Sequence, residues 1–345
     1  MTHRPRPDLS VGILTTPIYG AETPHRQQLA EHRELVEAAD QLGFDMIVAG
    51  QHFLGTELRY YQPVPYLTYL SMFAPKMSVV TGIMLLSMAN PVDLAEQIAT
   101  LDVLTAGKCV FGVGLGYSDR EFKAFGVDPK VKVSRFEEGL DLIKRLWSGD
   151  RVDYVGRYWT VEGVTPSVLP AQRPRPPIWI GGQSSPGVRR AARLGDAWYA
   201  PPFPTHDALA QLRKLFLEER EAAGLPAAGD FPLRRELIVA DSRSEARALA
   251  AERSALRYMT YARWGLRGEN TPARSAGAAG AAGAAVDVDE QFILGSPAEC
   301  VDQLGELRES LGMTHFMYKA HWPGLPHRDA MRQLDRFGSE VLPHV

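Results

Sequence analysis

The chain has 345 residues, 45% of them in the hydrophobic set, and a formal net charge of −3 at pH 7. This length is sufficient for two average domains or for one large α/β barrel. The near-neutral charge and the lack of a long basic run give no support for binding to nucleic acid or to an anionic membrane surface.

The first ten residues, MTHRPRPDLS, contain basic side chains but no apolar run behind them, so they do not resemble a signal peptide. No stretch approaches the roughly 20 apolar residues that cross a bilayer. Cys109 and Cys300 lie far apart without metal-ligand spacing, which favours two buried thiols over a disulfide. We therefore expect a soluble, cytoplasmic protein, and the sequence shows no metal-binding motif.

Short apolar segments alternate with amphipathic segments along the whole chain. Eight strands are predicted to begin at Val11, Phe44, Lys76, Lys108, Ile178, Asp196, Arg234 and Thr314. Helices are predicted at 31–42, 134–147, 207–223, 242–264 and 327–341, and further helices are predicted to begin at Pro91, near Ser185 and at Pro297. Continuous apolar strands suit a parallel sheet covered on both faces. Eight βα units predict an α/β (β/α)8 TIM barrel with insertions, in a single domain; a doubly wound open sheet is the alternative.

Three of these helices carry start signals. Asn90 can cap a helix that has proline at its first position. Capping boxes are predicted where Ser134 precedes Glu137 and where Ser296 precedes Glu299, each by three residues.

Two segments interrupt the alternation. Residues 151–177 are rich in Gly, Pro and Tyr and are predicted to form an excursion with a hairpin. Residues 275–285, SAGAAGAAGAA, have glycine at every third position and lie within a predicted mobile loop at 266–290. This loop is either an inert insertion or a lid over a site.

The strand that begins at Lys108 ends in three spaced glycines, Gly112, Gly114 and Gly116. A strand end without side chains lets a flat ligand approach the backbone. The spacing differs from the dinucleotide fingerprint GxGxxG, so a Rossmann fold is disfavoured.

This glycine-rich region resembles the bacterial luciferase-like monooxygenase family, whose members bind FMN or the deazaflavin F420 on a TIM barrel. Further segments agree with the resemblance in the same order: GFDMIVAGQHF at 43–53, EFKAFGVD at 121–128, SRFEEGLDLIKRLW at 134–147, PIWIGGQSSPGVRRAARLGDAWY at 177–199 and ILGSPAECVDQL at 293–304.

The resemblance implies a two-component monooxygenase. Reduced FMN from a separate flavin reductase would react with O2 to give a flavin peroxide or hydroperoxide, which oxidises a small organic substrate. A homodimer is also expected. The alternatives are an F420-dependent hydride-transfer oxidoreductase and a flavin-binding protein without turnover.

The cofactor phosphate is expected at the start of the helix after strand five, because helix N-termini attract anions. The family holds this phosphate in the same place. The predicted residues are Gly182, Gln183, Ser184, Ser185 and Gly187. Leu115 stands where the luciferases have a phosphate-binding arginine, which keeps F420 open.

The resemblance also implies residues around the flavin ring. His52 is the catalytic candidate for proton transfer, although Gln51 replaces the glutamate of the family's Glu-His pair. The peptide between Gly82 and Ile83 is expected to be cis. Further contacts are predicted from Ser87, Asn90 and Tyr117.

Two other pairs of residues are interpreted from position. Glu121 and Arg135 are expected to form an ion pair that orders a loop. His321 and Trp322 follow the last strand and are predicted either to line the substrate pocket or to close the barrel.

Overall fold

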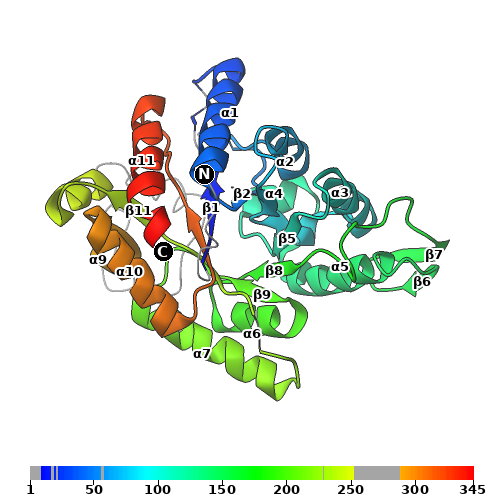
Figure 1. The fold of residues 1–345 in the computed structure, drawn as a ribbon. Coiled ribbons are helices and arrows are strands. Elements are labelled where there is room, and N and C mark those ends of the chain that lie inside the picture. Colours follow the sequence, from blue (N-terminus) through cyan, green and yellow to red (C-terminus); the bar gives the residue numbers. More distant parts are fainter. Residues whose placement is uncertain (1–8, 17–18, 21, 56–57, 228, 252–287) are drawn as a thin grey trace, which may run out of the picture.

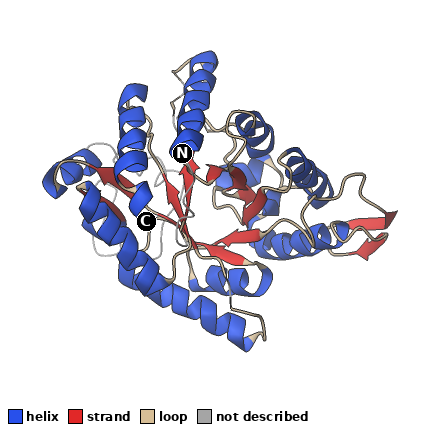
Figure 2. Ribbon diagram, in the orientation of Figure 1, coloured by secondary structure: helices blue, strands red, loops and turns tan. Residues whose placement is uncertain are grey.

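The computed structural model describes residues 9–16, 19–20, 22–55, 58–227, 229–251 and 288–345. Eight parallel strands form its centre: β1 (Ser10–Leu14), β2 (Met46–Ala49), β3 (Ser78–Thr81), β5 (Cys109–Gly114), β8 (Ile178–Gly181), β9 (Ala197–Tyr199), β10 (Pro232–Arg234) and β13 (His315–Tyr318). Their order is β10-β13-β1-β2-β3-β5-β8-β9. A parallel bridge between Ala200 and Leu233 brings the two ends together. The predicted (β/α)8 barrel is thus confirmed, as a nearly closed barrel with helices outside it (Figures 1 and 2).

The helices are α1 (His25–Leu42), α2 (Pro63–Ser71), α3 (Pro91–Leu104), α4 (Asp119–Ala124), α5 (Lys132–Leu146), α6 (Ser185–Leu194), α7 (His206–Ala222), α9 (Val288–Gln291), α10 (Pro297–Leu311) and α11 (His327–Glu340). Short 3-10 turns lie at η1 (Leu86–Met88), η2 (Pro129–Val131) and η3 (Leu342–His344). Another helix begins at Arg243 and continues to the end of the described segment at Ala251.

Two apolar clusters stabilise the closed arrangement of these strands in the barrel. One cluster lies between the strands and the surrounding helices and includes Ile47, Val79, Phe111 and Ile180. A second cluster fills the barrel interior with side chains from alternate strand positions: Leu14, Met46, Val48, Val80, Val110, Trp179, Ala197, Tyr199 and Met317. Strands buried on both faces in this way read as continuous apolar runs, which is why their positions were predictable.

The predicted seventh strand, which was expected to begin at Arg234, is wrong in its boundaries. The barrel strand β10 ends at Arg234, and β11 (Glu236–Val239) pairs with β12 (Phe292–Gly295) in a separate two-stranded parallel sheet. Arg235 lies between them, fully buried, and donates through Nη1 to the carbonyl of Pro202 at 2.8 Å. The apolar pattern could not reveal this break.

The helix starts agree in part with the prediction. Asn90 caps α3 by accepting from the backbone of Val92, and Ser296 and Glu299 form the predicted capping box. The capping box at Ser134 is wrong, because α5 already begins at Lys132 after the η2 turn.

An antiparallel hairpin extends from the barrel in the 151–177 segment (Figure 1). Its strands are β6 (Val152–Val155) and β7 (Thr160–Val164), and a two-residue strand β4 (Met84–Leu85) pairs with β5 near the mouth. Glu138 on α5 accepts from the backbone N–H of Tyr158 at 2.9 Å, which fixes the hairpin turn to the barrel. The predicted loop at 275–285 lies outside the described residues, as does nearly all of 266–290.

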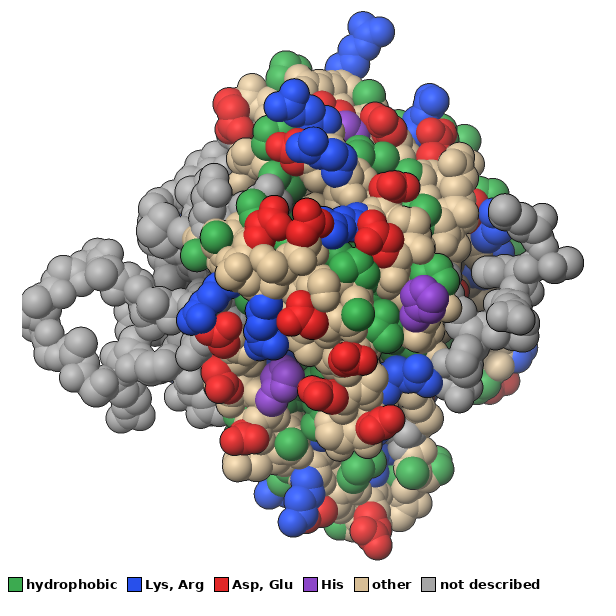
Figure 3. Space-filling view, turned by 60° about the vertical axis from the view of Figure 1, so that its left-hand side comes forward, with side chains coloured by type: hydrophobic (Ala, Val, Ile, Leu, Met, Phe, Trp, Pro, Cys, Tyr) green, Lys and Arg blue, Asp and Glu red, His purple; other side chains and the backbone are tan. Residues whose placement is uncertain are grey.

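The helices that the structure describes include none that is both long and apolar enough to cross a membrane. Cys109 and Cys300 are buried free thiols, as predicted. On the face in Figure 3, acidic and basic side chains are interspersed, and hydrophobic side chains form small separate areas.

Candidate active site

A cavity of about 520 Å³ opens at the carboxyl ends of the barrel strands. Loops after β1, β2, β3, β5, β8, β9 and β10 contribute to it, together with the starts of α5 and α6. This is the end of a TIM barrel at which ligand sites form, and the volume is that of a small-molecule site.

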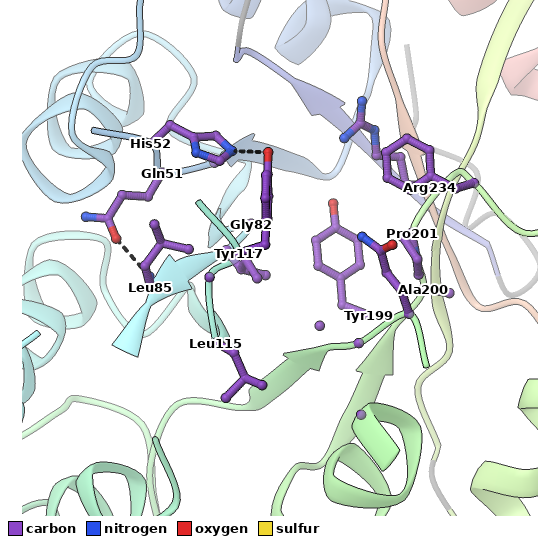
Figure 4. Close-up of a pocket in the computed structure, with 18 of the residues that line it drawn as sticks. Gln51, His52, Gly82, Leu85, Leu115, Tyr117, Tyr199, Ala200, Pro201 and Arg234 are labelled. Atoms are coloured by element: carbon purple, nitrogen blue, oxygen red, sulfur yellow. Dashed lines mark hydrogen bonds between the residues drawn. The ribbon is translucent and has the colours of Figure 1, made fainter. Parts of the chain in front are cut away.

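Glycines around Ile83 leave room for its side chain at this cavity. A Cβ on Gly114 would lie 2.1 Å from Ile83 Cδ1, and one on Gly82 would lie 2.5 Å from Val48 Cγ1. The Gly82–Ile83 peptide is cis, as predicted from the resemblance. Gln51 holds this turn: its backbone N–H donates to Ile83 O at 3.2 Å, and its Oε1 accepts from Leu85 N at 2.8 Å (Figure 4).

His52 lies at one side of the cavity, and the structure gives it the carboxylate that residue 51 lacks. Its Nδ1 is 3.0 Å from Oε1 of Glu121 on α4, and Glu121 is 1% exposed. The same oxygen also accepts from the backbone N–H of Phe53 at 2.6 Å. Because a carboxylate only accepts, Nδ1 carries the proton and Nε2 is left as an acceptor.

The acceptor Nε2 faces Tyr117. The Tyr117 hydroxyl is 3.2 Å from Nε2 of His52, and Tyr117 lines the cavity (Figure 4). Glu121, His52 and Tyr117 therefore form a continuous chain of hydrogen bonds from the buried Glu121 carboxylate on α4 to the cavity. The predicted ion pair of Glu121 with Arg135 is wrong, since Arg135 donates through Nε to Ser87 O at 3.0 Å.

Most residues of the predicted anion site also line this cavity. Gly182, Gln183, Ser184 and Gly187 line the cavity at the start of α6, where Ser184 is the N-cap residue. A Cβ on Gly182 would lie 2.9 Å from the Gly187 carbonyl carbon, so this loop and helix can meet only through glycine. Ser185 is not part of the lining, which includes Pro186 instead.

Two cations beside this site were missed in the sequence. Lys132 and Arg190 both line the cavity, and Nε of Arg190 donates to Glu137 at 3.0 Å. Arg190 lies one turn after Gly187 on the predicted helix, which was a usable signal. Lys132 was missed because the helix was predicted to begin at residue 134, whereas α5 begins at Lys132. Leu115 lines the same cavity and brings no charge.

Tyr199, another missed residue, points its hydroxyl into the cavity from the end of β9 (Figure 4). The side chain is buried, and its hydroxyl has no hydrogen-bond partner within the described part of the chain. Burial raises the pKa of this hydroxyl to about 12, so it stays protonated and can donate. Arg234 at the end of β10 also lines the cavity.

The remaining predicted residues lie outside the lining. Ser87 is buried and its hydroxyl donates to Lys132 O at 2.8 Å, while Asn90 caps α3. His321 packs against Tyr19 with ring centroids 5.0 Å apart, and Trp322 packs in a cluster beside β11 and β12. Neither His321 nor Trp322 is among the residues that line the cavity.

The geometry defines an α/β barrel whose mouth brings the glycine-lined start of α6 and a histidine paired with a buried carboxylate to one cavity. The chain belongs to the luciferase-like monooxygenase family, whose model matches residues 9–315. Flavin-dependent monooxygenases and F420-dependent oxidoreductases are both among its homologues, so its relatives are oxidoreductases.

Individual relatives span these activities. Over 313 residues the chain is 26% identical to the 4-hydroxyprotoasukamycin monooxygenase of Streptomyces nodosus, covering 88% of this chain and 83% of that one. It is 25% identical to the F420-dependent glucose-6-phosphate dehydrogenase of Beutenbergia cavernae, covering 89% and 90%. An uncharacterized protein of Sinorhizobium fredii, y4wF, is 30% identical over 169 residues, and the match spans about half (49%) of either chain.

Among solved structures, the fold is similar to the monooxygenase RslO1 of Streptomyces bottropensis. The TM-score is 0.83 at 24% identity, with 97% of this chain and 99% of that chain covered. This likeness supports the barrel architecture.

Proposed function

We propose that the chain is the oxygenase of a two-component monooxygenase, which takes reduced FMN from a separate flavin reductase and uses O2 to oxidise a small organic substrate. The observation that carries the proposal is one cavity lined both by the glycine-rich start of α6 and by the Tyr117–His52–Glu121 chain of hydrogen bonds. Reduced FMN, when bound, supplies the electrons and activates O2. The same residues fit reduced F420, which is the alternative cofactor.

The phosphate of the cofactor would bind at the start of α6. Ser184 and the backbone of Gly187 offer donors, and the positive end of the helix dipole favours the anion. Lys132 and Arg190 add positive charge at the same cavity, so the luciferase arginine that Leu115 replaces has substitutes from α5 and α6.

The ring system would lie against Ile83 and the glycines around it. Tyr199 has a buried hydroxyl that needs an acceptor, and an oxidised or reduced isoalloxazine ring carries carbonyl oxygens of that kind. Pro201, Pro202 and Phe203 form an apolar wall, which helps to exclude water from the reaction.

Tyr117 and His52 would move a proton at the substrate. The Tyr117 hydroxyl donates to His52 Nε2, so loss of a proton from Tyr117 to the imidazole gives a cation that the Glu121 carboxylate stabilises. The presence of this carboxylate also weakens the case for a flavin-binding protein without turnover.

Anaerobic titration with reduced FMN and reduced F420 tests the cofactor. We expect saturable FMN binding with an affinity at least about 10-fold above that for F420, equivalent to about 1.4 kcal/mol. Tight F420 binding without FMN affinity would instead assign hydride transfer. Bound FMN without O2-dependent oxidation of any compound in a panel of apolar and aromatic substrates would support a non-catalytic protein.

The reductase partner and the dimer are part of the proposal. Oxygen consumption should require a flavin reductase or chemically reduced FMN, and sedimentation should give twice the mass of the 38.1 kDa chain.

A further inference from the structure

A second cluster of chemically active side chains lies behind the barrel mouth and outside the cavity lining. It consists of Glu31 on α1, His321 after β13 and His327 at the start of α11. One donor atom from each of the three lies within 4.8 Å of the others. These residues come from both ends of the chain, so no sequence spacing could reveal them.

The hydrogen bonds of the two histidines leave one nitrogen of each available. Nδ1 of His321 donates to the carbonyl of Trp322 at 3.1 Å, and Nε2 of His327 donates to the Glu34 carboxylate at 3.0 Å. The other nitrogens, Nε2 of His321 and Nδ1 of His327, are buried and have no partner among the described residues. His321 is 1% exposed, so solvent does not satisfy it.

This pattern is what a metal-binding histidine requires. A ligating imidazole usually donates its second N–H to a backbone carbonyl or a carboxylate, which fixes the tautomer and orients the ring. Burial, with a smaller contribution from Lys319, lowers the pKa of His321 to about 3, so its imidazole is neutral at pH 7 and able to ligate.

The carboxylate of the cluster is also held in place. Glu31 accepts hydrogen bonds from the Tyr19 hydroxyl and from Nε2 of Gln27, the latter at 2.9 Å. Each oxygen of Glu31 keeps a further acceptor position, because a carboxylate oxygen can accept more than one bond. The positive charge of Lys319 disfavours a cation at this cluster. The negative charges of Glu31 and Glu34 compensate for it.

We infer that Glu31, His321 and His327 bind one divalent transition-metal ion, with Zn²⁺ as the ion of first choice. Two imidazoles and one carboxylate are ligand types that zinc accepts, with water at the open position. Ligands at about 2.1 Å in a tetrahedral site stand about 3.4 Å apart, so the donors would move inward by side-chain rotation. The ion would join α1, the segment after β13 and α11.

The test uses the full-length protein after dialysis against a chelator. Isothermal titration with Zn²⁺ should give one ion per chain, and Co²⁺ should produce visible absorption bands of a low-coordinate site. The melting temperature should rise with Zn²⁺ concentration, because a ligand that binds only the folded state stabilises it.

Three variants locate the ion. Glu31→Gln and His327→Asn each remove one ligand and should weaken Zn²⁺ affinity by about 100-fold or more, whereas Glu34→Gln, which acts through His327, should cost about 10- to 100-fold. Glu37→Gln is the matched control, because Glu37 lies on the same helix and pairs with Arg33 outside the cluster. Circular dichroism checks that each variant is folded.

The proposal is overturned if the folded wild-type chain shows no saturable Zn²⁺ or Co²⁺ binding. It is equally overturned if Glu31→Gln and His327→Asn bind Zn²⁺ as tightly as Glu37→Gln does. None of these measurements depends on flavin or on turnover, so the result is independent of the proposed function.

Discussion

The carboxylate of Glu121 accepts a hydrogen bond from Nδ1 of His52 at 3.0 Å, across 69 positions of sequence. This contact supplies the acid–histidine pair that the sequence alone, with Gln51 before His52, does not show. Gln51 instead bonds to the backbone of Leu85 and supports the cis turn. Glu121 therefore pairs with His52, while Gln51 holds the backbone of the turn.

Substitution of Glu121 by Gln should lower kcat/KM about 100-fold, because the charge that stabilises a protonated His52 is removed. The amide oxygen can still accept from Phe53, so the fold should be preserved. Steady-state oxygen consumption with saturating reduced FMN measures the effect. Asp119→Asn, on the same helix, should leave the rate unchanged, and equal rates for both variants would exclude a role for Glu121 in catalysis.

The Lys132→Gln variant should bind FMN about 10-fold more weakly, since one charge-assisted contact with phosphate contributes about 1.5 kcal/mol. Riboflavin, which lacks the phosphate, should bind both proteins equally. Fluorescence titration with the two flavins makes this comparison, and Lys130→Gln is the control because Lys130 lies on the adjacent η2 turn outside the cavity. A parallel loss of riboflavin affinity would place Lys132 away from the phosphate.

Removal of the Tyr199 hydroxyl should affect the stability of the free chain and its affinity for flavin in different ways. Tyr199→Phe removes a buried group without a described partner, so the free chain should be as stable as wild type or more stable by up to about 1 kcal/mol. Flavin affinity should fall about 5-fold. Tyr66→Phe is the contrasting variant, since the Tyr66 hydroxyl is 2.8 Å from Nδ1 of His32 and its loss should destabilise the chain by about 1 kcal/mol. Urea unfolding and flavin titration measure the two effects.

Much of the barrel could be predicted, because a strand that is buried on both faces is a continuous run of apolar residues in the sequence. The site could be predicted where it depends on strand ends, as for His52 and Gly182. It could not be predicted where a contact joins distant segments, as Glu121 and His52 show. The two alternatives for His321 stayed open for a related reason: its position after a strand was known, but the direction of the chain beyond Tyr318 was not.

Gly112 allows a close approach between β5 and β3. A Cβ at Gly112 would lie 1.9 Å from the carbonyl oxygen of Thr81, and this backbone atom cannot move aside without shifting a strand. Gly112→Ala should therefore reduce the free energy of unfolding by about 3 kcal/mol or more. Gly305 on α10 has nothing within 4 Å, and Gly305→Ala should stabilise the chain by about 0.5–1 kcal/mol. Urea denaturation of the two variants should show shifts of opposite sign.

The buried histidines His32 and His321 should make the chain less stable in mild acid. Burial is the main cause that lowers the pKa of each to about 3, against 6.5 for the ordinary side chain. Between these values the unfolded chain binds more protons than the folded chain, so acidification favours unfolding. Stability is fully present above about pH 6.5 and falls toward pH 3, by up to about 1.4 kcal/mol per pH unit for each histidine.

Urea unfolding at about pH 7, 6 and 5, with a chelator present to keep the cluster free of metal, measures this loss. His321→Asn should reduce the slope between about pH 6 and 5, because one of the buried histidines that are held neutral in the folded chain is removed. His344→Asn should leave the slope unchanged, since His344 is exposed near the C-terminus. A wild-type midpoint that stays constant from pH 7 to 5 would show that neither histidine is held neutral by the fold.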